Sequence, residues 1–81
     1  MVWTMRLKDK QAYADSVVEK LTHSREKFIK YRIHGNQIVF YFLTKMGERT
    51  YALDAELFYY YLHAEPHEIA DYIENFLMYF E

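Results

Sequence analysis

Residues 28–43 read FIKYRIHGNQIVFYFL, and this stretch decides the fold. Two runs rich in β-branched and aromatic residues flank Gly35-Asn36, a dipeptide typical of a two-residue hairpin turn. With two residues in the turn, the register of the hairpin follows by counting outward from it. The expected pairs are His34 with Gln37, Ile33 with Ile38, Arg32 with Val39, Tyr31 with Phe40, Lys30 with Tyr41, Ile29 with Phe42, and Phe28 with Leu43.

A second turn, expected at Met46-Gly47, returns the chain as ERTYALD, residues 48–54. Counting from it pairs Phe42 with Tyr51 and Phe40 with Leu53. Alternate residues of the three strands then share one face, and all of them are apolar or aromatic: Ile29, Tyr31, Ile33, Ile38, Phe40, Phe42, Tyr51 and Leu53. This agreement predicts a three-stranded antiparallel meander whose inner face lies in the core.

The segment before the hairpin predicts a helix from Lys8 to about Ser24, with Asp9 as its N-cap. Its apolar residues follow the i, i+3, i+4, i+7 spacing of a helical stripe: Ala14, Val17, Val18 and Leu21. Residues 1–7 alternate in polarity, which indicates an extended arm or a short edge strand. Trp3 and Met5 of this arm are candidates to cover the outer face of the sheet.

After the sheet, Asp54 is expected to cap a short helix from Ala55 to His63. Leu57, Phe58, Tyr61 and Leu62 would form its buried side. Pro66 suits the first turn of a final helix. That helix has an apolar stripe through Ile69, Ile73, Phe76, Leu77 and Phe80. The sequence therefore predicts a single α+β domain, residues 1–81, in the order α-β-β-β-α-α with the helices on one face of the sheet.

Composition narrows the classes of function. The chain has no cysteine, so disulfides and thiolate chemistry are excluded. The longest uninterrupted apolar run, residues 38–43, is far shorter than the roughly 20 residues that span a bilayer, and no signal peptide is evident at the N-terminus. We expect a cytoplasmic protein without membrane contact. Both glycines belong to turns and no serine has a His-Asp context, so we expect neither an enzyme nor a cofactor.

Charge divides unevenly along the chain. Residues 1–50 carry all ten Lys and Arg and five acids, whereas residues 51–81 carry seven acids and no base, which gives +5 and −7. Such asymmetry favours one of two interpretations. Either each half faces a charged partner, or the two halves attract each other within one domain.

The acidic half combines carboxylates with exposed tyrosines. Tyrosine is enriched at the centre of protein interfaces, and acids favour a basic protein surface over nucleic acid. We therefore expect a protein partner with a basic surface, bound by a helical pair. The candidate partner-binding residues, with Tyr72 and Tyr79 expected at the border of the apolar stripe and the others exposed, are Glu56, Tyr59, His63, Glu65, Glu68, Asp71, Tyr72, Glu74, Met78 and Tyr79.

A metal site is not expected in this half. His63 and His67 have the i, i+4 spacing of a chelating pair on a helix, but Pro66 interrupts that helix between them. The spacing therefore does not bring the two rings onto one helical face.

Nucleic-acid binding is the alternative function. The outer sheet face is expected to interleave cations with an aromatic ring, a pattern that suits single-stranded nucleic acid. The candidate residues are Lys30, Arg32, His34, Tyr41 and Lys45, supported by the basic residues of the first helix. The aliphatic residues of the same face would also allow a homodimer.

Two resemblances concern the order of elements. The α-β-β-β-α portion resembles the double-stranded-RNA-binding domain, whose last helix begins with a basic cluster that grips phosphates. Here that helix begins EPHEIAD, residues 65–71, so no residue is carried over. The full order and the acidic helices are similar to small phage-encoded inhibitors, including anti-CRISPR proteins that present acids to a nucleic-acid-binding groove. This resemblance implies an inhibitor or regulator of phage or bacterial origin.

Overall fold

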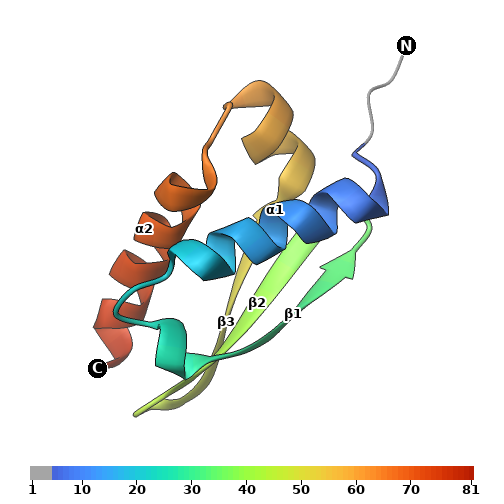
Figure 1. The fold of residues 1–81 in the computed structure, drawn as a ribbon. Coiled ribbons are helices and arrows are strands. Elements are labelled where there is room, and N and C mark those ends of the chain that lie inside the picture. The colour runs from blue at the N-terminus through green and yellow to red at the C-terminus, as the bar shows by residue number, and fades with distance from the viewer. Residues whose placement is uncertain (1–4) are drawn as a thin grey trace.

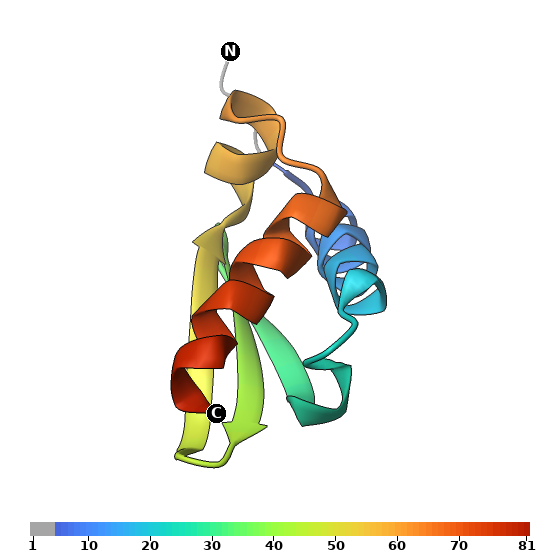
Figure 2. The ribbon, with the colours of Figure 1, turned by 90° about the vertical axis from the view of Figure 1, so that its left-hand side faces the viewer.

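The computed structural model describes residues 5–81 and confirms the α+β architecture. Three antiparallel strands form one sheet in the order β1-β2-β3. Both α-helices pack on the same side of this sheet (Figures 1 and 2). The elements are α1 (Leu7–Lys20), η1 (Arg25–Lys27), β1 (Phe28–His34), β2 (Gln37–Thr44), β3 (Gly47–Asp54), η2 (Leu57–Tyr61), α2 (Pro66–Leu77) and η3 (Met78–Phe80).

The core lies between the central strand and the two helices. Ile38, Phe40 and Phe42 on β2 are fully buried. They belong to one apolar cluster with residues of the two helices and with Leu21, which follows α1; the helical members include Val17, Ile69, Ile73 and Leu77. Complete burial of a side chain of this size contributes about 1.5–3 kcal/mol. The stripes predicted for the two helices are therefore the surfaces that cover the sheet.

The first hairpin has the predicted register from its turn as far as the pair Lys30–Tyr41. Beyond that pair a bulge shifts the ladder, so that Phe28, not Ile29, pairs with Phe42. The inserted residue reverses the alternation of side chains. Phe28 therefore turns inward, with its ring centroid 5.8 Å from that of Phe42, while Ile29 is 47% exposed. The assignment of Ile29 to the inner face was wrong.

The second turn consists of Lys45 and Met46, one residue earlier than expected, and Thr44 pairs with Gly47. The Thr44 hydroxyl closes it, accepting from the Met46 N–H at 3.1 Å and donating to the Gly47 carbonyl oxygen at 2.7 Å. The pairing of β2 with β3 is therefore displaced by two residues, and Phe40 faces Tyr51. Because side chains alternate with a period of two, the inner face keeps its predicted β3 residues.

The N-terminal segment differs from the expectation in three ways. The first helix begins at Leu7 and ends at Lys20, and Asp9 lies in its first turn instead of capping it. Met5 is buried in the core cluster and lines a hollow beside α1, so it does not cover the outer sheet face. Residues 1–4, which include Trp3, lie outside the described residues.

Residues 55–62 wind more widely than the expected helix. Asp54 caps the segment as predicted, since its carboxylate accepts from the Leu57 N–H at 3.0 Å. The Leu62 N–H then donates to the Leu57 carbonyl oxygen, five residues back, at 2.9 Å, so residues 57–61 form a π-helical turn. This winding rotates the buried side onto Phe58 and Tyr60. Tyr61, predicted to be core, is 77% exposed, and Leu57 and Leu62 are exposed as well.

Glu74 holds the loop after α1 against α2. Its carboxylate accepts hydrogen bonds from the backbone N–H of His23 at 2.6 Å, the N–H of Ser24 at 3.0 Å and the Thr22 hydroxyl at 2.9 Å. Partial burial by itself would raise the pKa of Glu74, but these hydrogen bonds outweigh it and lower the pKa. The carboxylate is thus a structural group, and its assignment to an exposed binding surface is corrected.

Replacing Glu74→Gln should lower the free energy of unfolding near pH 7 by about 1–2 kcal/mol, because the backbone donors lose a charged acceptor. The folded-state pKa of Glu74 lies below its unfolded value, so its stabilisation is present above that value, about 4.3, and is lost as the pH falls through the folded pKa. In urea titrations the difference between the two proteins should therefore shrink as the pH falls below the unfolded pKa of glutamate.

The matched control is Asp71→Asn on the same helix, because Asp71 is exposed and makes no side-chain hydrogen bond within residues 5–81. It should change stability by less than about 0.5 kcal/mol throughout this pH range. A Glu74→Gln variant as stable as the wild type near neutral pH would show that this carboxylate does not hold the loop.

Candidate functional site

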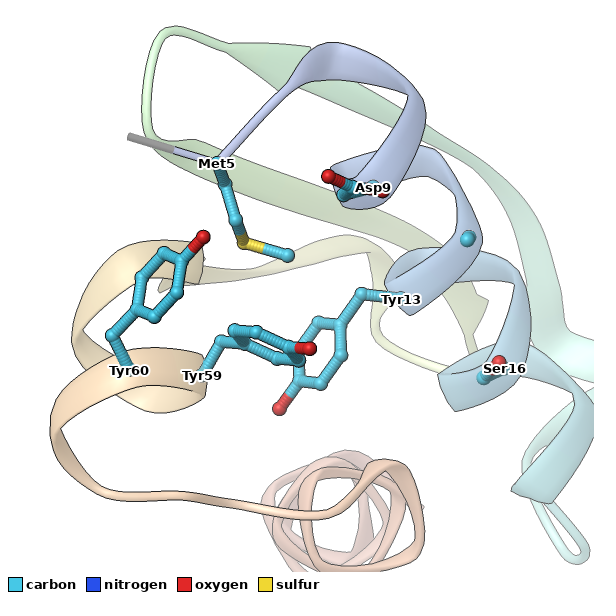
Figure 3. A pocket seen from close by; sticks show the side chains of 7 residues that line it. Met5, Asp9, Tyr13, Ser16, Tyr59 and Tyr60 are labelled. Carbon is cyan, nitrogen blue, oxygen red and sulfur yellow. The ribbon is translucent and has the colours of Figure 1, made fainter. Parts of the chain in front are cut away.

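Two adjoining hollows surround three tyrosines where α1, η2 and the start of α2 meet, and Figure 3 shows residues that line the first of them. Tyr13, Tyr59 and Tyr60 line both of them. The first, of about 330 Å³, is completed by Met5, Asp9, Ala12 and Ser16. The second, of about 400 Å³, is completed by His63, Ala64, Glu65 and Pro66. We call the two hollows together the tyrosine cleft.

Tyr13 connects the cleft to the core. It lies on α1 four residues before Val17, so it continues the apolar stripe of that helix. Only 6% of its surface is exposed. Its hydroxyl donates to the carbonyl oxygen of Ala64 at 2.8 Å, which ties α1 to the segment that joins η2 and α2.

The environment of Tyr13 is acidic as well as apolar. Burial raises the pKa of Tyr13 to about 12, and the negative charges of Glu65 and Glu68 add to the shift. The phenol therefore stays protonated at neutral pH and keeps its role as a donor. The same shift indicates that the field of these two carboxylates reaches into the cleft.

Tyr59 and Tyr60 come from the π-helical turn. The Tyr59 ring lies edge-to-face with Tyr13, with centroids 5.7 Å apart, and edge-to-face with Tyr60, with centroids 5.0 Å apart. Tyr59 is 46% exposed, in agreement with the expectation that it points away from the core. Figure 3 shows the rings meeting between α1 and η2, with the thioether of Met5 beside them. The row is thus anchored at Tyr13 and open at Tyr59.

Each hollow of the cleft has a carboxylate in its lining. Asp9 belongs to the first hollow and Glu65 to the second, and among residues 5–81 no lysine or arginine lines either. The Glu68 side chain accepts a hydrogen bond from the Glu65 N–H at 3.1 Å, which fixes it beside the second hollow. Asp71 is exposed one turn further along α2. An electron-rich aromatic row therefore has a negative border.

The cleft gathers only part of the predicted partner-binding set. It brings together Tyr59, His63 and Glu65, with Glu68 and Asp71 on the adjoining turns of α2. Four candidates lie further along the chain on α2 and η3: Tyr72, Glu74, Met78 and Tyr79. Of these, Met78 and Tyr79 line a separate shallow hollow with Asn75.

Several predicted exposures need correction. Glu56, Glu68 and Glu74 are half-buried rather than exposed, and Oε1 of Glu56 is shielded from solvent without a hydrogen-bond partner in residues 5–81. Tyr79 is 83% exposed and Tyr72 is 50% exposed, so neither ring is buried at the border of the apolar stripe. The remaining candidates, Tyr59, His63, Glu65, Asp71 and Met78, are exposed as expected.

Sequence reasoning missed Met5, Asp9, Tyr13 and Tyr60 as members of the cleft. One signal was available, because Tyr13 has the spacing of the helical stripe and its hydroxyl needs a partner when the ring is buried. No comparable signal identifies Tyr60, since its position depends on the π-helical winding of residues 57–61.

The residues proposed for nucleic-acid binding lie outside the cleft. Lys30, Arg32 and His34 are exposed along β1, whereas Lys45 lies in the turn at the opposite end of the sheet. The ammonium of Lys30 lies 5.2 Å from the centroid of the Tyr41 ring, so this platform already carries a cation on its face. Glu48 and Asp54 of β3 share the outer face, so its formal charges nearly cancel.

The first helix is not a basic surface either. Lys8, Lys10 and Lys20 are balanced by its three acids, Asp9, Asp15 and Glu19. Lys10 is buried, and its ammonium donates to the Gly35 carbonyl oxygen at 2.6 Å and to Oδ1 of Asn36 at 3.3 Å. It therefore fastens α1 to the first hairpin turn and is not available to phosphates.

Metal sites and membrane-spanning helices are the remaining features to consider in the part of the chain that the structure describes. No group of three or more histidine, aspartate or glutamate side chains there is arranged to hold a metal ion. None of the helices in residues 5–81 is long and apolar enough to cross a membrane.

Comparisons with protein-family models, with curated proteins and with solved structures find no match to this chain. Functional inference therefore depends on the geometry and charge of the tyrosine cleft.

Removing only the hydroxyl, in Tyr13→Phe, should lower the free energy of unfolding near pH 7 by about 0.5–1.5 kcal/mol, because the Ala64 carbonyl loses its donor. The pKa of Tyr13 is raised in the folded state, so its stabilisation is complete below the unfolded pKa of about 10 and is lost as the pH rises through about 12. Chemical denaturation across this range should show a shallower alkaline loss in the variant.

Tyr61→Phe is the matched control. Tyr61 is exposed on the π-helical turn of residues 57–61, and its hydroxyl makes no hydrogen bond within residues 5–81. Equal effects of the two substitutions would contradict a structural role for the Tyr13 hydroxyl.

Proposed function

We propose that this chain is a non-enzymatic interaction domain, an inhibitor or regulator, that docks the tyrosine cleft and the adjoining turns of α2 on a basic surface of a partner protein. The observation that carries the proposal is the open tyrosine row bordered by Asp9 and Glu65. Rigid aromatic side chains are the commonest anchors of protein interfaces, and carboxylates around them favour a cationic partner.

The distribution of ion pairs supports a charged partner over internal neutralisation. Of the seven acids in residues 51–81, Glu81 is the one that pairs directly with a lysine or arginine in the described chain, with its carboxylate 2.7 Å from the Lys27 ammonium. Glu65 and Asp71 are exposed on one side of the cleft. Their charge is therefore free to act on an approaching molecule, within the range of about 8–10 Å set by salt screening.

Two observations weigh against the other classes of function. The outer sheet face and α1 each carry nearly balanced formal charge, which gives little attraction for a polyanion. Within residues 5–81 no histidine side chain is hydrogen-bonded to a hydroxyl or carboxylate group, so no hydroxyl there has a histidine as its general base.

Site-specific photocrosslinking in the cells that produce the protein tests the proposal. A photoreactive amino acid should capture a protein from position 63, which is exposed in the cleft, and from position 72, which is exposed on α2. The same group at position 32 or 50 on the outer sheet face should capture little. The double variant Glu65→Lys with Asp71→Lys should reduce capture at position 63 at least tenfold, because both substitutions repel a basic surface.

A second double variant, Glu19→Lys with Glu26→Lys, is the control, since it makes the same change in net charge at exposed positions away from the cleft. Equal losses with both pairs would mean that net charge alone matters. Capture of a protein or a nucleic acid mainly from positions 32 and 50 would contradict the proposal and favour the outer sheet face.

A further inference from the structure

The rings of the cleft leave concave corners. The plane of Tyr59 makes angles of 82° with Tyr13 and 85° with Tyr60. In such a T-shaped pair, one ring stands on the face of the other, and each side of the standing ring is a corner walled by the faces of both. Aromatic faces carry the negative part of the ring quadrupole, so a corner of this kind attracts a cation from two directions.

Each hollow adds a carboxylate to these faces. Asp9 lines the hollow next to α1, and Glu65 lines the hollow next to α2. Each hollow exceeds 300 Å³, which is ample for the end of one long basic side chain. Each hollow is thus lined by aromatic rings and one carboxylate. Such a lining is complementary to a cationic group that has apolar atoms around its charge.

Other aromatic faces of this protein already hold a cation. The guanidinium of Arg49 lies 4.8 Å from the Phe80 ring centroid, and the ammonium of Lys30 lies 5.2 Å from that of Tyr41. Within residues 5–81 no lysine or arginine occupies the corresponding place against Tyr59. The cleft is therefore an aromatic site beside acids, and none of the lysines and arginines in residues 5–81 supplies a cation to it.

We propose that the tyrosine cleft binds the ammonium or guanidinium group of a lysine or arginine side chain. This inference rests on the proposed function and deepens it, because it names the group on the partner that the cleft recognises. Binding would place the charge in a corner beside Tyr59, within reach of Asp9 or Glu65, and the aliphatic stem of the side chain against Tyr60 or Met5.

Small cations test this without the partner. Protein labelled with ¹³C in its tyrosine rings is titrated near pH 7 with butylammonium, methylguanidinium and tetramethylammonium, at constant ionic strength. Neopentyl alcohol serves as a neutral molecule of similar size to tetramethylammonium. We expect saturable shifts in the signals of Tyr13, Tyr59 and Tyr60, and binding of the neutral molecule at least tenfold weaker. The ratio for butylammonium and methylguanidinium distinguishes a lysine from an arginine ligand.

Substitutions locate the site. Tyr59→Leu should lower the affinity for the cations at least fivefold. Asp9→Asn or Glu65→Gln should lower that affinity about twofold to fivefold. Tyr61→Leu on the same turn should leave affinity unchanged, because Tyr61 lines neither hollow. Circular dichroism confirms that each variant is folded, and the Asp9→Asn result carries the test if Tyr59→Leu unfolds.

Equal affinity for neopentyl alcohol would overturn the inference and leave the cleft as an apolar pocket. Shifts that never saturate, or that are as large at Tyr41 and Tyr79, would also overturn it, because they indicate diffuse attraction of cations to the surface. In either case crosslinking from positions 63 and 72 would still succeed if the proposed docking surface is right, so the two failures are distinguishable.

Discussion

Both helices pack on the buried face of β2, and the hydrogen bond from the Tyr13 hydroxyl to the Ala64 carbonyl oxygen ties α1 to the chain that leads into α2. It crosses 51 residues of sequence and joins α1 to the point where the chain leaves the π-helical turn for α2. In a domain of 81 residues the core is small, so a few long-range contacts must fix how the helices sit on the sheet. At the opposite end of the helices, Glu74 performs the equivalent task on the loop after α1. Between these two contacts the helices cover the sheet, and the buried Tyr13 ring supports the exposed ring of Tyr59.

The parts of the fold that the sequence predicted are those governed by periodicity. The alternation around Gly35-Asn36 gave the meander and most of its inner face, and a two-residue error in the pairing of β2 with β3 left the faces unchanged. A bulge inserts one residue into a strand and reverses the alternation beyond it, and for this reason Ile29 was assigned to the wrong face. No sequence pattern in residues 28–30 predicts the bulge. The π-helical winding likewise has no sequence period, and it moved Tyr61 out of the core while bringing Tyr60 toward it. Sequence reasoning thus found Tyr59, His63 and Glu65 of the candidate site and missed Asp9, Tyr13 and Tyr60.

Electrostatics links the fold to its proposed role. The excess of acids in residues 51–81 is nearly balanced by the bases of residues 1–50, so the whole chain has a net charge of only −2. Few of these acids form an ion pair with a base, however, and Glu81 with Lys27 is the pair seen in the described residues. Where a base is needed inside the fold it is used locally, as Lys10 is on the first hairpin turn and Arg49 is on Phe80. The carboxylates around the cleft have no such partner lining the hollows in the described chain, and their field acts on Tyr13. The proposed binding of a basic partner uses these carboxylates, because no lysine or arginine among residues 5–81 lines the hollows.

The central claim is that the tyrosine cleft, and not the outer sheet face, contacts the partner protein. The most direct measurement is a ¹H–¹⁵N NMR titration of the labelled domain with the purified partner, which reports on every backbone amide at once. We expect the largest changes at residues 9–16 and 59–71, around the two hollows, and small changes at residues 30–34 and 39–41. Chemical-shift changes concentrated at residues 30–34 and 39–41, with no change at the residues of the cleft, would contradict the claim. They would place the interface on the opposite side of the sheet.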